Sequence, residues 1–305
     1  MNNYMVFDIG GSSIKWSVIN DKGEFFKSDK IYIPKTKEEF FDSMASKVND
    51  LKEEYKLKGI GISAPGAVDC EIGTIGGTAA FSLRYIHGPN FKEILKEKTG
   101  LEVEIENDAN CAALGECWCG AAKDTKDCAF IVCGTGIGGA LVKDKKIHTG
   151  IHKHGGEFGY TLVDVNVKTQ KYLSWSEVGS TFALAKAIAE RKGIDPNLFN
   201  GLKAFELYEK SDEIAIEEVN RFFRYMAVGI YNIQYTYDPE VILLGGAVCE
   251  RESFIEEVNK KVEEVVRANV DAKIYPTIRR CKYGNDANKL GALYNFLQRI
   301  ILVGM

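Results

Sequence analysis

The densest polar group in the sequence is ENDAN at residues 106–110, which lies between an apolar strand pattern and an apolar helix pattern. Where a strand gives way to a helix, side chains can face a crevice. Asn and Asp are favoured N-caps, so one of these residues could serve only to begin the helix. A carboxylate here could also accept the proton of a hydroxyl group that attacks a phosphoryl group. Since a cap needs only one such residue, Asp108 is the candidate general base.

A second candidate site begins at Asp8, which ends an apolar run and is followed by a turn of glycine and serine. Gly10 and Gly11 let the backbone approach phosphate oxygens, and the hydroxyl of Ser12 can donate to them. A carboxylate repels phosphate unless a cation lies between them. We therefore expect Asp8 to hold Mg²⁺, directly or through water. Lys15 either reaches toward phosphate or is a solvated strand residue.

Residues 131–147 repeat the plan of residues 6–26: an apolar run, a glycine turn, a second apolar run and a polar reversal. A repeated supersecondary unit indicates fold and site together. The unit is a β-hairpin whose glycine turn exposes backbone N–H groups, and two such hairpins can clasp a polyphosphate. In the second hairpin the expected phosphate-binding residues are Gly134, Thr135, Gly136 and Gly138.

Two other glycine motifs do not fit the second run. It matches the dinucleotide pattern G-x-G-x-x-G, which requires a helix straight after the glycines. The residues that follow, 140–142, read as a strand and lead to a charged turn. A P-loop would end in Gly-Lys-Ser or Gly-Lys-Thr and open a helix, and neither glycine run does so. Tight turns without a ligand are the remaining alternative.

Two later positions complete the candidate site. Glu157 lies in the loop GGEFGY at residues 155–160, where a carboxylate could accept hydrogen bonds from the vicinal hydroxyls of a sugar, although a surface loop is the alternative. Gly245 and Gly246 end a third apolar strand pattern, and small residues there leave room for a nucleoside. The four histidines, at 87, 148, 152 and 154, read as surface or loop residues.

Composition limits the function classes. A chain of 305 residues that is 45% hydrophobic can form two domains. The net charge is −4 and no long run of residues carries one sign, so the charge pattern does not indicate binding to nucleic acid or to a membrane surface. No apolar run is long enough to span a bilayer, and the first strand pattern follows Met1–Tyr4 with no charged leader. We expect a cytoplasmic protein with reduced thiols, and we interpret Cys117-Trp118-Cys119 as packing.

The periodic patterns predict the elements that position these residues. We expect strands at Met5–Ile9, Trp16–Asn20, Glu24–Ile33, Gly59–Ser63, Val103–Glu106 and Glu240–Leu244. We expect helices at Glu38–Glu54, Asn90–Lys98, Asn107–Cys119, Ser180–Lys192, Glu213–Tyr237, Phe254–Ala268 and Ala287–Ile300. The repeat predicts two α/β domains, residues 1–118 plus 288–305 and residues 119–287, with the active site in the cleft between them.

The motifs together resemble those of the ROK family of bacterial sugar kinases. They are DIGGSSIK at 8–15, GISAPGAVD at 61–69, ENDANCAALGE at 106–116, GTGIGG at 134–139, GGEFGY at 155–160 and LLGGAV at 243–248. The resemblance implies an α/β, two-domain actin/hexokinase/heat-shock ATPase-like fold with duplicated ribonuclease H-like domains, ATP and Mg²⁺ as cofactors, and a homodimer. It implies that Asp108 is the catalytic base and that Asn107, Glu157 and Gly66 bind the hexose. It also implies that the two glycine hairpins bind the phosphates of ATP.

The chain departs from the family pattern after Glu157. Most members have a histidine at the position of Tyr160, and a cysteine-rich segment then completes a structural zinc site. Residues 161–176 contain no cysteine, so no zinc site is expected. Tyr160 is the candidate replacement for the sugar contact of that histidine, and Glu177 is the candidate match for a later family glutamate. Residues 85–90, YIHGPN, resemble the zinc-lacking branch that includes β-glucoside kinases.

The resulting hypothesis is an ATP-dependent kinase that phosphorylates the 6-hydroxyl of a glucose-type hexose or β-glucoside. N-acetylmannosamine is the alternative substrate. The alternative from another class is a non-enzymatic sugar-sensing regulator, because the family includes repressors. Those repressors carry a helix-turn-helix before the first glycine motif, and the sequence has no such segment before residue 5.

Overall fold

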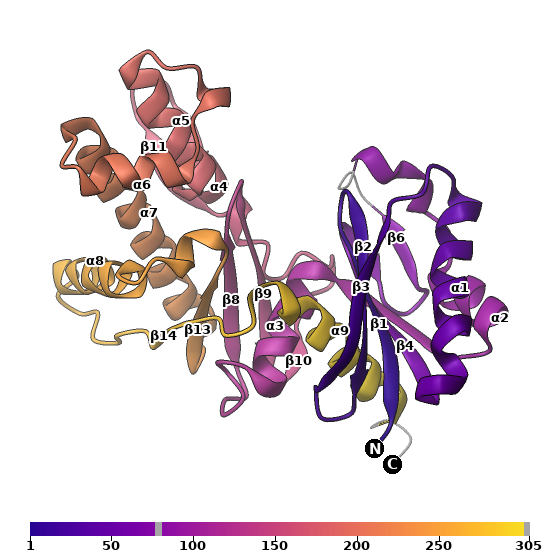
Figure 1. Ribbon diagram of the computed structural model, residues 1–305. Helices are drawn as coiled ribbons and strands as arrows, with labels where there is room; N and C mark the ends of the chain where they lie inside the picture. The colour runs from indigo at the N-terminus through magenta and orange to yellow at the C-terminus, as the bar shows by residue number, and fades with distance from the viewer. Residues whose placement is uncertain (77–80, 302–305) are drawn as a thin grey trace. The chain divides into compact units, whose positions relative to one another are not determined.

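The structure is a computed structural model that describes residues 1–76 and 81–301 (Figure 1). The chain divides into two compact units. Unit 1 comprises the residues up to Lys123 and those from Asn285 onward, and unit 2 spans Asp124–Gly284. Each unit contains its own five-stranded sheet. The domain boundaries predicted from the repeat, after residues 118 and 287, stay a prediction.

The sheet of unit 1 has the strand order β3-β2-β1-β4-β7. Its strands are β1 (Asn3–Ile9), β2 (Ser13–Asn20), β3 (Phe25–Tyr32), β4 (Leu57–Ala64) and β7 (Val103–Asn107). The first three form an antiparallel meander, and β4 and β7 continue the sheet parallel to β1. β1 and β4 are buried along nearly their whole length, as expected of central strands covered on both faces.

Helices cover both faces of this sheet. Figure 1 shows α1 (Lys37–Tyr55) and α2 (Phe91–Thr99) on one face. α9 (Ala287–Phe296) lies against the other face together with α3 (Asp108–Cys119), and a π-helical turn, Leu297–Ile301, extends it. The remaining short elements of this unit are β5 (Ala67–Asp69), β6 (Thr74–Gly76) and the 3₁₀ segment Phe81–Ile86.

Glycines let α9 lie directly on the sheet. A Cβ placed on Gly59 would overlap the ring of Phe296, and one on Gly61 would lie 2.7 Å from the carbonyl oxygen of Ala292. Both glycines point to the same face of β4, because side chains alternate along a strand. Gly291 likewise has no space for a Cβ against Cys111 of α3. Glycines on the sheet and on the helix therefore let α9 approach closely, while its buried Leu290, Leu293 and Phe296 supply the apolar contact.

Unit 2 repeats the sheet plan, with the order β10-β9-β8-β13-β14. Its strands are β8 (Cys128–Cys133), β9 (Ile137–Lys143), β10 (Lys146–Ile147), β13 (Val241–Gly245) and β14 (Ile278–Arg280). An antiparallel hairpin, β8–β9, is again followed by strands parallel to its first member. The duplicated glycine hairpin predicted from the sequence is confirmed.

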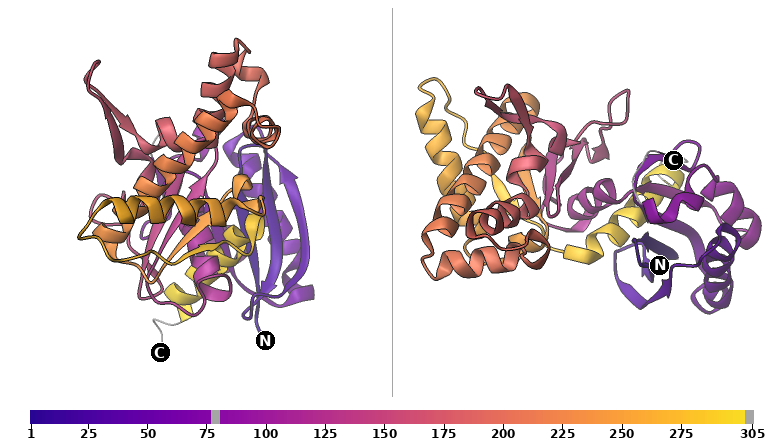
Figure 2. Two further views of the ribbon diagram at one scale, coloured as in Figure 1. Left: turned by 90° about the vertical axis from the view of Figure 1, so that its left-hand side faces the viewer. Right: turned by 90° about the horizontal axis from the view of Figure 1, so that it is seen from above.

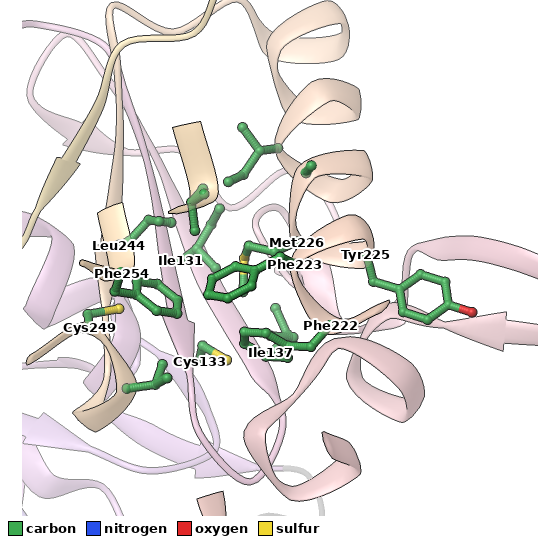
Figure 3. Close-up of a cluster of buried hydrophobic side chains, with 14 of the residues drawn as sticks. Ile131, Cys133, Ile137, Phe222, Phe223, Tyr225, Met226, Leu244, Cys249 and Phe254 are labelled. Atoms are coloured by element: carbon green, nitrogen blue, oxygen red, sulfur yellow. The ribbon is translucent and has the colours of Figure 1, made fainter. Parts of the chain in front are cut away.

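The core of unit 2 forms between its sheet and long helices. The helices of this unit are α4 (Trp175–Gly179), α5 (Thr181–Lys192), α6 (Gly201–Glu209), α7 (Glu213–Tyr237) and α8 (Phe254–Ala268), with 3₁₀ turns at Phe158–Tyr160, Pro196–Leu198 and Ala247–Glu250. A further 3₁₀ turn, Gly284–Asp286, leads from unit 2 into unit 1. Figure 3 shows Phe223 and Met226 of α7 meeting Phe254 of α8 and Ile131 of β8. Tyr225 points away from this cluster and donates a hydrogen bond of 2.7 Å to Asp164.

The largest missed element is the hairpin formed by β11 (Leu162–Asn166) and β12 (Lys171–Ser174), which projects from unit 2 in Figure 2. Most of its side chains are exposed, so its sequence carries no alternation between apolar and polar residues. The short helix α6 was also missed. The final helix was predicted to run to Ile300, whereas its α-helical part ends at Phe296.

Across the described residues, no helix combines the length and apolar character that a membrane span requires.

Candidate functional site

Unit 1 brings polar side chains together at the carboxyl ends of three adjacent strands. Asp8 of β1 pairs in register with Ser63 of β4, and Ser63 pairs with Glu106 of β7. The chain then leaves β7 through Asn107 and enters α3 at Asp108. Carboxyl ends of parallel strands are where α/β sheets bind ligands. Asp8 is about a hundred residues away from Asn107 and Asp108 in the sequence, yet all three lie at the same edge of the sheet.

The carboxylate of Asp8 is held by two neutral donors. Ser63 Oγ lies 3.0 Å from Asp8 Oδ1, and Asn288 Nδ2 lies 3.1 Å from the same oxygen. The other oxygen, Oδ2, faces the ammonium group of Lys15 at 3.9 Å. The side chain of Lys15 is 46% exposed, so this ion pair is long and solvated. One carboxylate oxygen is therefore fixed, and the other remains able to meet a cation.

The glycine turn after Asp8 leaves its backbone open. The N–H of Gly10 donates to the carbonyl of Ser13 at 3.0 Å, which closes the turn between β1 and β2. Gly11 and Ser12 are exposed, and a Cβ placed on Gly11 would have no described atom within 4 Å. Backbone and hydroxyl groups here are accessible to an anion.

Asn107, and not Asp108, supplies the N-cap of α3. Its Oδ1 accepts hydrogen bonds from the N–H groups of Ala109 at 2.9 Å and Asn110 at 3.2 Å. Its amide nitrogen donates to the carbonyl of Gly66 at 2.9 Å. Asn107 therefore fixes the start of α3 to the loop that follows β4. The carboxylate of Asp108 is not required to begin the helix.

The surroundings of Asp108 favour its protonated form. Burial raises the pKa of this carboxyl above its ordinary value, and the negative charge of Asp8 raises it further. The N–H of Ala109, which donates to Asp108 Oδ1 at 2.8 Å, opposes that shift. A carboxylate with a raised pKa is a stronger base, which suits proton abstraction near neutral pH.

Glu106, the residue before Asn107, stabilises the turn from β7 into α3. It is 5% exposed and accepts hydrogen bonds from the amide of Asn110 at 2.9 Å and from the thiol of Cys70 at 3.0 Å. Its Oε1 also accepts from the N–H of Asn107 at 2.7 Å. These bonds fix the backbone on which Asn107 and Asp108 stand. The sequence contained Glu106 in the polar group, but gave no signal of its contact with Cys70.

The glycine turn of unit 2 is fixed by two helix starts. The carbonyl of Gly134 accepts from the N–H of Thr181 at 3.1 Å and from its hydroxyl at 2.6 Å. The N–H of Ile137 donates to Ser176 Oγ at 2.9 Å. Thr135 is exposed at the tip of the turn. Ser176 and Thr181 belong to α4 and α5 and were not identified from the sequence.

The glycines of this hairpin have different roles. Gly134, Thr135 and Gly136 form the turn, whereas Gly138 lies within β9 opposite Val132. Gly246, after β13, has a φ of +99° and no space for a Cβ against the carbonyl of Cys133. Close packing thus accounts for Gly246, and Gly245 is the last residue of β13.

The loop with Glu157 and Tyr160 exposes both side chains. Tyr160 is 76% exposed, and its N–H donates to the carbonyl of Glu157 at 3.2 Å. Gly156 has a φ of +92°, and a Cβ there would lie 2.7 Å from Cα of Ala140 in β9. The loop is consequently pressed against the glycine hairpin, with its acid and its aromatic ring facing solvent.

Glu177 is held in a capping box at the start of α4. Its Oε2 accepts from both the N–H and the hydroxyl of Ser174 at 2.9 Å, and its Oε1 lies 3.3 Å from the ammonium group of Lys171. The hydrogen bonds from Ser174, together with Lys171, lower the pKa of Glu177 to about 2. The carboxylate is thus ionised and oriented by the β11–β12 hairpin.

Among the described residues, no group of three or more His, Cys, Asp or Glu side chains could hold a metal ion. A single carboxylate such as Asp8 suits Mg²⁺, which protein sites bind through one or two carboxylates and the phosphates of a substrate.

The chain matches the family described as "ROK family" over residues 4–299. A β-glucoside kinase of Listeria monocytogenes is 32% identical over 295 residues, which cover 96% of this chain and 96% of that protein. A ROK family protein of Streptococcus pneumoniae, solved with sucrose, is 35% identical with a TM-score of 0.85, covering 96% of this chain and 98% of the other. A Listeria monocytogenes structure provisionally assigned as an N-acetylmannosamine kinase is 32% identical with a TM-score of 0.82, covering 97% and 99%.

Two α/β units built on the same hairpin-containing sheet, with these neighbours, define an ATP-dependent sugar phosphotransferase of the actin/hexokinase-like ATPase fold. The predicted fold class is confirmed. The chain belongs to the ROK family.

Proposed function

We propose that the chain transfers the γ-phosphoryl group of ATP to the 6-hydroxyl of a glucose-type hexose or β-glucoside, with Asp108 as general base. The observation that carries this proposal is that two neighbouring residues at the start of α3 have different roles. Asn107 makes the cap, so the carboxylate of Asp108 is left for chemistry. Its raised pKa makes it a better proton acceptor than an ordinary aspartate.

The sugar-binding residues are proposed as Asn107, Glu157, Tyr160, Gly66 and Glu177. The side-chain amide of Asn107 donates one N–H to the carbonyl of Gly66. Its second N–H is left to donate to a sugar hydroxyl. Glu157 and Tyr160 are exposed and need no rearrangement to meet a ligand. Glu177 is already bonded to Ser174 and Lys171, so any sugar contact would use its remaining lone pairs.

The phosphates of ATP are assigned to the two glycine turns. The proposed phosphate-binding residues are Gly10, Gly11, Ser12 and Lys15 in unit 1 and Gly134, Thr135, Gly136 and Gly138 in unit 2. Gly245 and Gly246, at the end of β13, are proposed to leave room for the nucleoside of ATP. Asp8 fits Mg²⁺ through its Oδ2, since Ser63 and Asn288 already occupy Oδ1. When bound, Mg²⁺ would neutralise charge on the phosphate oxygens. We propose that no zinc is needed, because residues 161–176, which include the β11–β12 hairpin, contain no cysteine thiolate for a structural zinc site.

β-Glucosides are favoured as substrates by two considerations. Relatives at this level of identity include β-glucoside kinases, and one similar structure contains the disaccharide sucrose. In addition, the exposed ring of Tyr160 could stack on a second ring attached at the anomeric carbon. N-acetylmannosamine is the rival, supported by the provisional assignment of the second similar structure.

A coupled assay of ADP release decides between these substrates. We expect the kcat/KM for cellobiose or glucose to exceed that for N-acetylmannosamine, with N-acetylglucosamine as a second acetamido sugar. A strong preference for N-acetylmannosamine would overturn the β-glucoside assignment and leave the kinase assignment intact. 6-Deoxyglucose should not be phosphorylated, and turnover of it would exclude the 6-hydroxyl as the phosphorylated group.

We also propose that the chain forms a homodimer. Light scattering, which measures the molar mass in solution, tests this.

A further inference from the structure

Ser176 occupies a junction in unit 2 that sequence patterns did not indicate. Its Oγ accepts a hydrogen bond from the N–H of Ile137 at 2.9 Å and lies 3.3 Å from the carbonyl oxygen of the same residue. Ile137 is the first residue of β9 and ends the glycine turn. One hydroxyl group therefore fixes both polar groups of the peptide backbone at the end of that turn.

The same hydroxyl contacts two glycines from different loops. A Cβ on Gly136, in the turn, would lie 3.3 Å from Ser176 Oγ. A Cβ on Gly159 would overlap Ser176 Oγ and the carbonyl oxygen of Ile137. Gly159 stands between Glu157 and Tyr160, so the proposed sugar loop rests directly on Ser176. The turn assigned to phosphate and the loop assigned to sugar thus meet at one side chain.

The helix that carries Ser176 is rigidly seated. Its first residue, Trp175, is fully buried, and Gly179 and Gly229 have no space for a Cβ against the indole ring. Its next residue after Ser176 is Glu177, which is fixed by the capping box with Ser174. A shift of either loop therefore cannot be absorbed by a free movement of α4, and it must be passed to the other loop.

We infer that Ser176 is a positioning residue that couples sugar binding to nucleotide binding. The inference rests on the proposed function of the two loops. A sugar held by Glu157 and Tyr160 orders the backbone at Gly159, which fixes Ser176 and through it the N–H of Ile137. A nucleotide then binds a turn that is already ordered and loses less conformational entropy. By reciprocity, the nucleotide strengthens sugar binding by the same factor.

The test is the affinity of the best sugar substrate, measured with and without a non-hydrolysable ATP analogue. Coupling between two sites commonly amounts to roughly 5- to 150-fold. We expect such a factor for the wild-type protein and a factor of ~2 or less for Ser176→Ala. Ser176→Cys is the second variant, because a thiol accepts hydrogen bonds weakly, and it should behave in the same way. Thermal unfolding establishes that each variant is folded.

Thr181→Ala is the matched control. Thr181 also bonds the glycine turn: its N–H and its hydroxyl both donate to the carbonyl of Gly134, and neither bond involves the loop with Gly159. Its loss should weaken binding of the nucleotide analogue while the coupling factor keeps its wild-type value. Hydrogen exchange adds a second measure: sugar should slow exchange of the turn at residues 134–138 in the wild-type protein and in Thr181→Ala, and should not do so in Ser176→Ala.

The outcomes separate the two proposals. Wild-type protein that phosphorylates no sugar of the panel overturns the proposed function, and this inference with it. An active wild-type enzyme whose sugar affinity ignores the nucleotide overturns the inference alone. So does an active, folded Ser176→Ala or Ser176→Cys variant with the full coupling factor, or a Thr181→Ala variant that loses the coupling equally.

Discussion

Asn288 donates a hydrogen bond of 3.1 Å from its side-chain amide to Oδ1 of Asp8, and so joins the last helix of unit 1 to its first strand. The contact belongs to a stripe of residues spaced four apart on α9. Ala292 packs on Gly61, and Phe296 packs on Gly59 and on the ring of Tyr4 at 5.4 Å. Residues four apart share one face of a helix. The seating of α9 on the sheet therefore sets the position of the amide that orients Asp8.

The first prediction follows from this contact. Asn288→Ala should remove one of the two hydrogen bonds to Oδ1 of Asp8 and leave the bond from Ser63, so that the carboxylate is oriented less firmly and holds a cation less well. We expect the Mg²⁺ concentration for half-maximal rate to rise roughly 2- to 12-fold, as for the loss of about 0.5–1.5 kcal/mol, because Ser63 still donates to the carboxylate. The rate at saturating Mg²⁺ should stay within about threefold of wild type.

Asn259→Ala is the control for that variant. It removes another helix amide, which donates to the carbonyl of Ile255 on the exposed side of α8, and its Mg²⁺ dependence should be unchanged. A wild-type Mg²⁺ dependence in Asn288→Ala would show that Asp8 does not act through the cation, or that Ser63 alone suffices to orient it.

The second prediction concerns the proposed base. Asp108→Asn keeps the shape of the side chain and its hydrogen bond with the N–H of Ala109, but an amide cannot accept the proton. General-base catalysis contributes about 10²- to 10⁴-fold, and we expect kcat to fall by that amount. Sugar affinity, measured by calorimetry, should remain near the wild-type value. Asp195→Asn removes the carboxylate of an exposed cap and serves as the control. A variant at position 108 with nearly full turnover would refute the role of Asp108.

The third prediction is that Asp108→Asn, which should lower activity, should raise the stability of the folded protein. Burial raises the pKa of Asp108 in the folded protein, so the folded state binds this proton more tightly than the unfolded state. Stability from this group then falls as pH rises from the unfolded pKa through the folded pKa. Asp108→Asn should therefore have a higher free energy of unfolding than wild type at pH 7.

That advantage should shrink as the pH falls toward the ordinary pKa of aspartate, at about 4. Urea unfolding of both proteins across this range measures the difference directly. If the variant is less stable than wild type at pH 7, the ionised carboxylate is stabilised by its surroundings, and the burial argument for a strengthened base is wrong. The acid limb of kcat/KM for the wild-type enzyme should likewise lie above the pKa of a free aspartate.

Some of these residues could be found from sequence and others could not, for a physical reason. Asp108 and Asn107 carry a local signal, since polar residues cluster at one change of element. The helices at Glu213–Tyr237 and Phe254–Ala268 were predicted with the observed bounds, because their apolar residues recur at helical spacing over many turns.

Ser63, Asn288 and Ser176 could not be found in this way. Each acts through a contact with a residue far away in the chain: Ser63 and Asn288 with Asp8, and Ser176 with Ile137. A lone serine or asparagine inside a strand or helix looks the same whether it is solvated or holds a catalytic group. The pairing of β4 with β1 brings Ser63 to Asp8, and the packing of α9 and α4 brings Asn288 and Ser176 to their partners.

The fourth prediction tests the acid of the proposed sugar loop. Glu157→Ala should weaken sugar binding by roughly 10- to 100-fold, because a hydrogen bond to a charged group contributes about 1.5–3 kcal/mol. Binding of the ATP analogue in the absence of sugar should be unaffected. Glu177→Gln should weaken sugar binding less than Glu157→Ala does, because Ser174 and Lys171 already engage the Glu177 carboxylate and leave it only its remaining lone pairs for a sugar. Unchanged sugar affinity in Glu157→Ala would remove this residue from the site.

The last prediction assigns substrate preference to Tyr160. Its ring is 76% exposed beside Glu157 and offers a flat apolar face, which can stack on the second ring of a disaccharide. Tyr160→Ala should therefore lower kcat/KM for cellobiose several-fold more than for glucose, whereas Tyr160→Phe, which keeps the ring and loses the hydroxyl, should retain the wild-type ratio of the two values. Exposed Tyr172, on the β11–β12 hairpin, provides the control, and Tyr172→Ala should leave the ratio unchanged. Equal losses for cellobiose and glucose in Tyr160→Ala would mean that the ring contacts the phosphorylated sugar itself, and the preference for β-glucosides would then need another source.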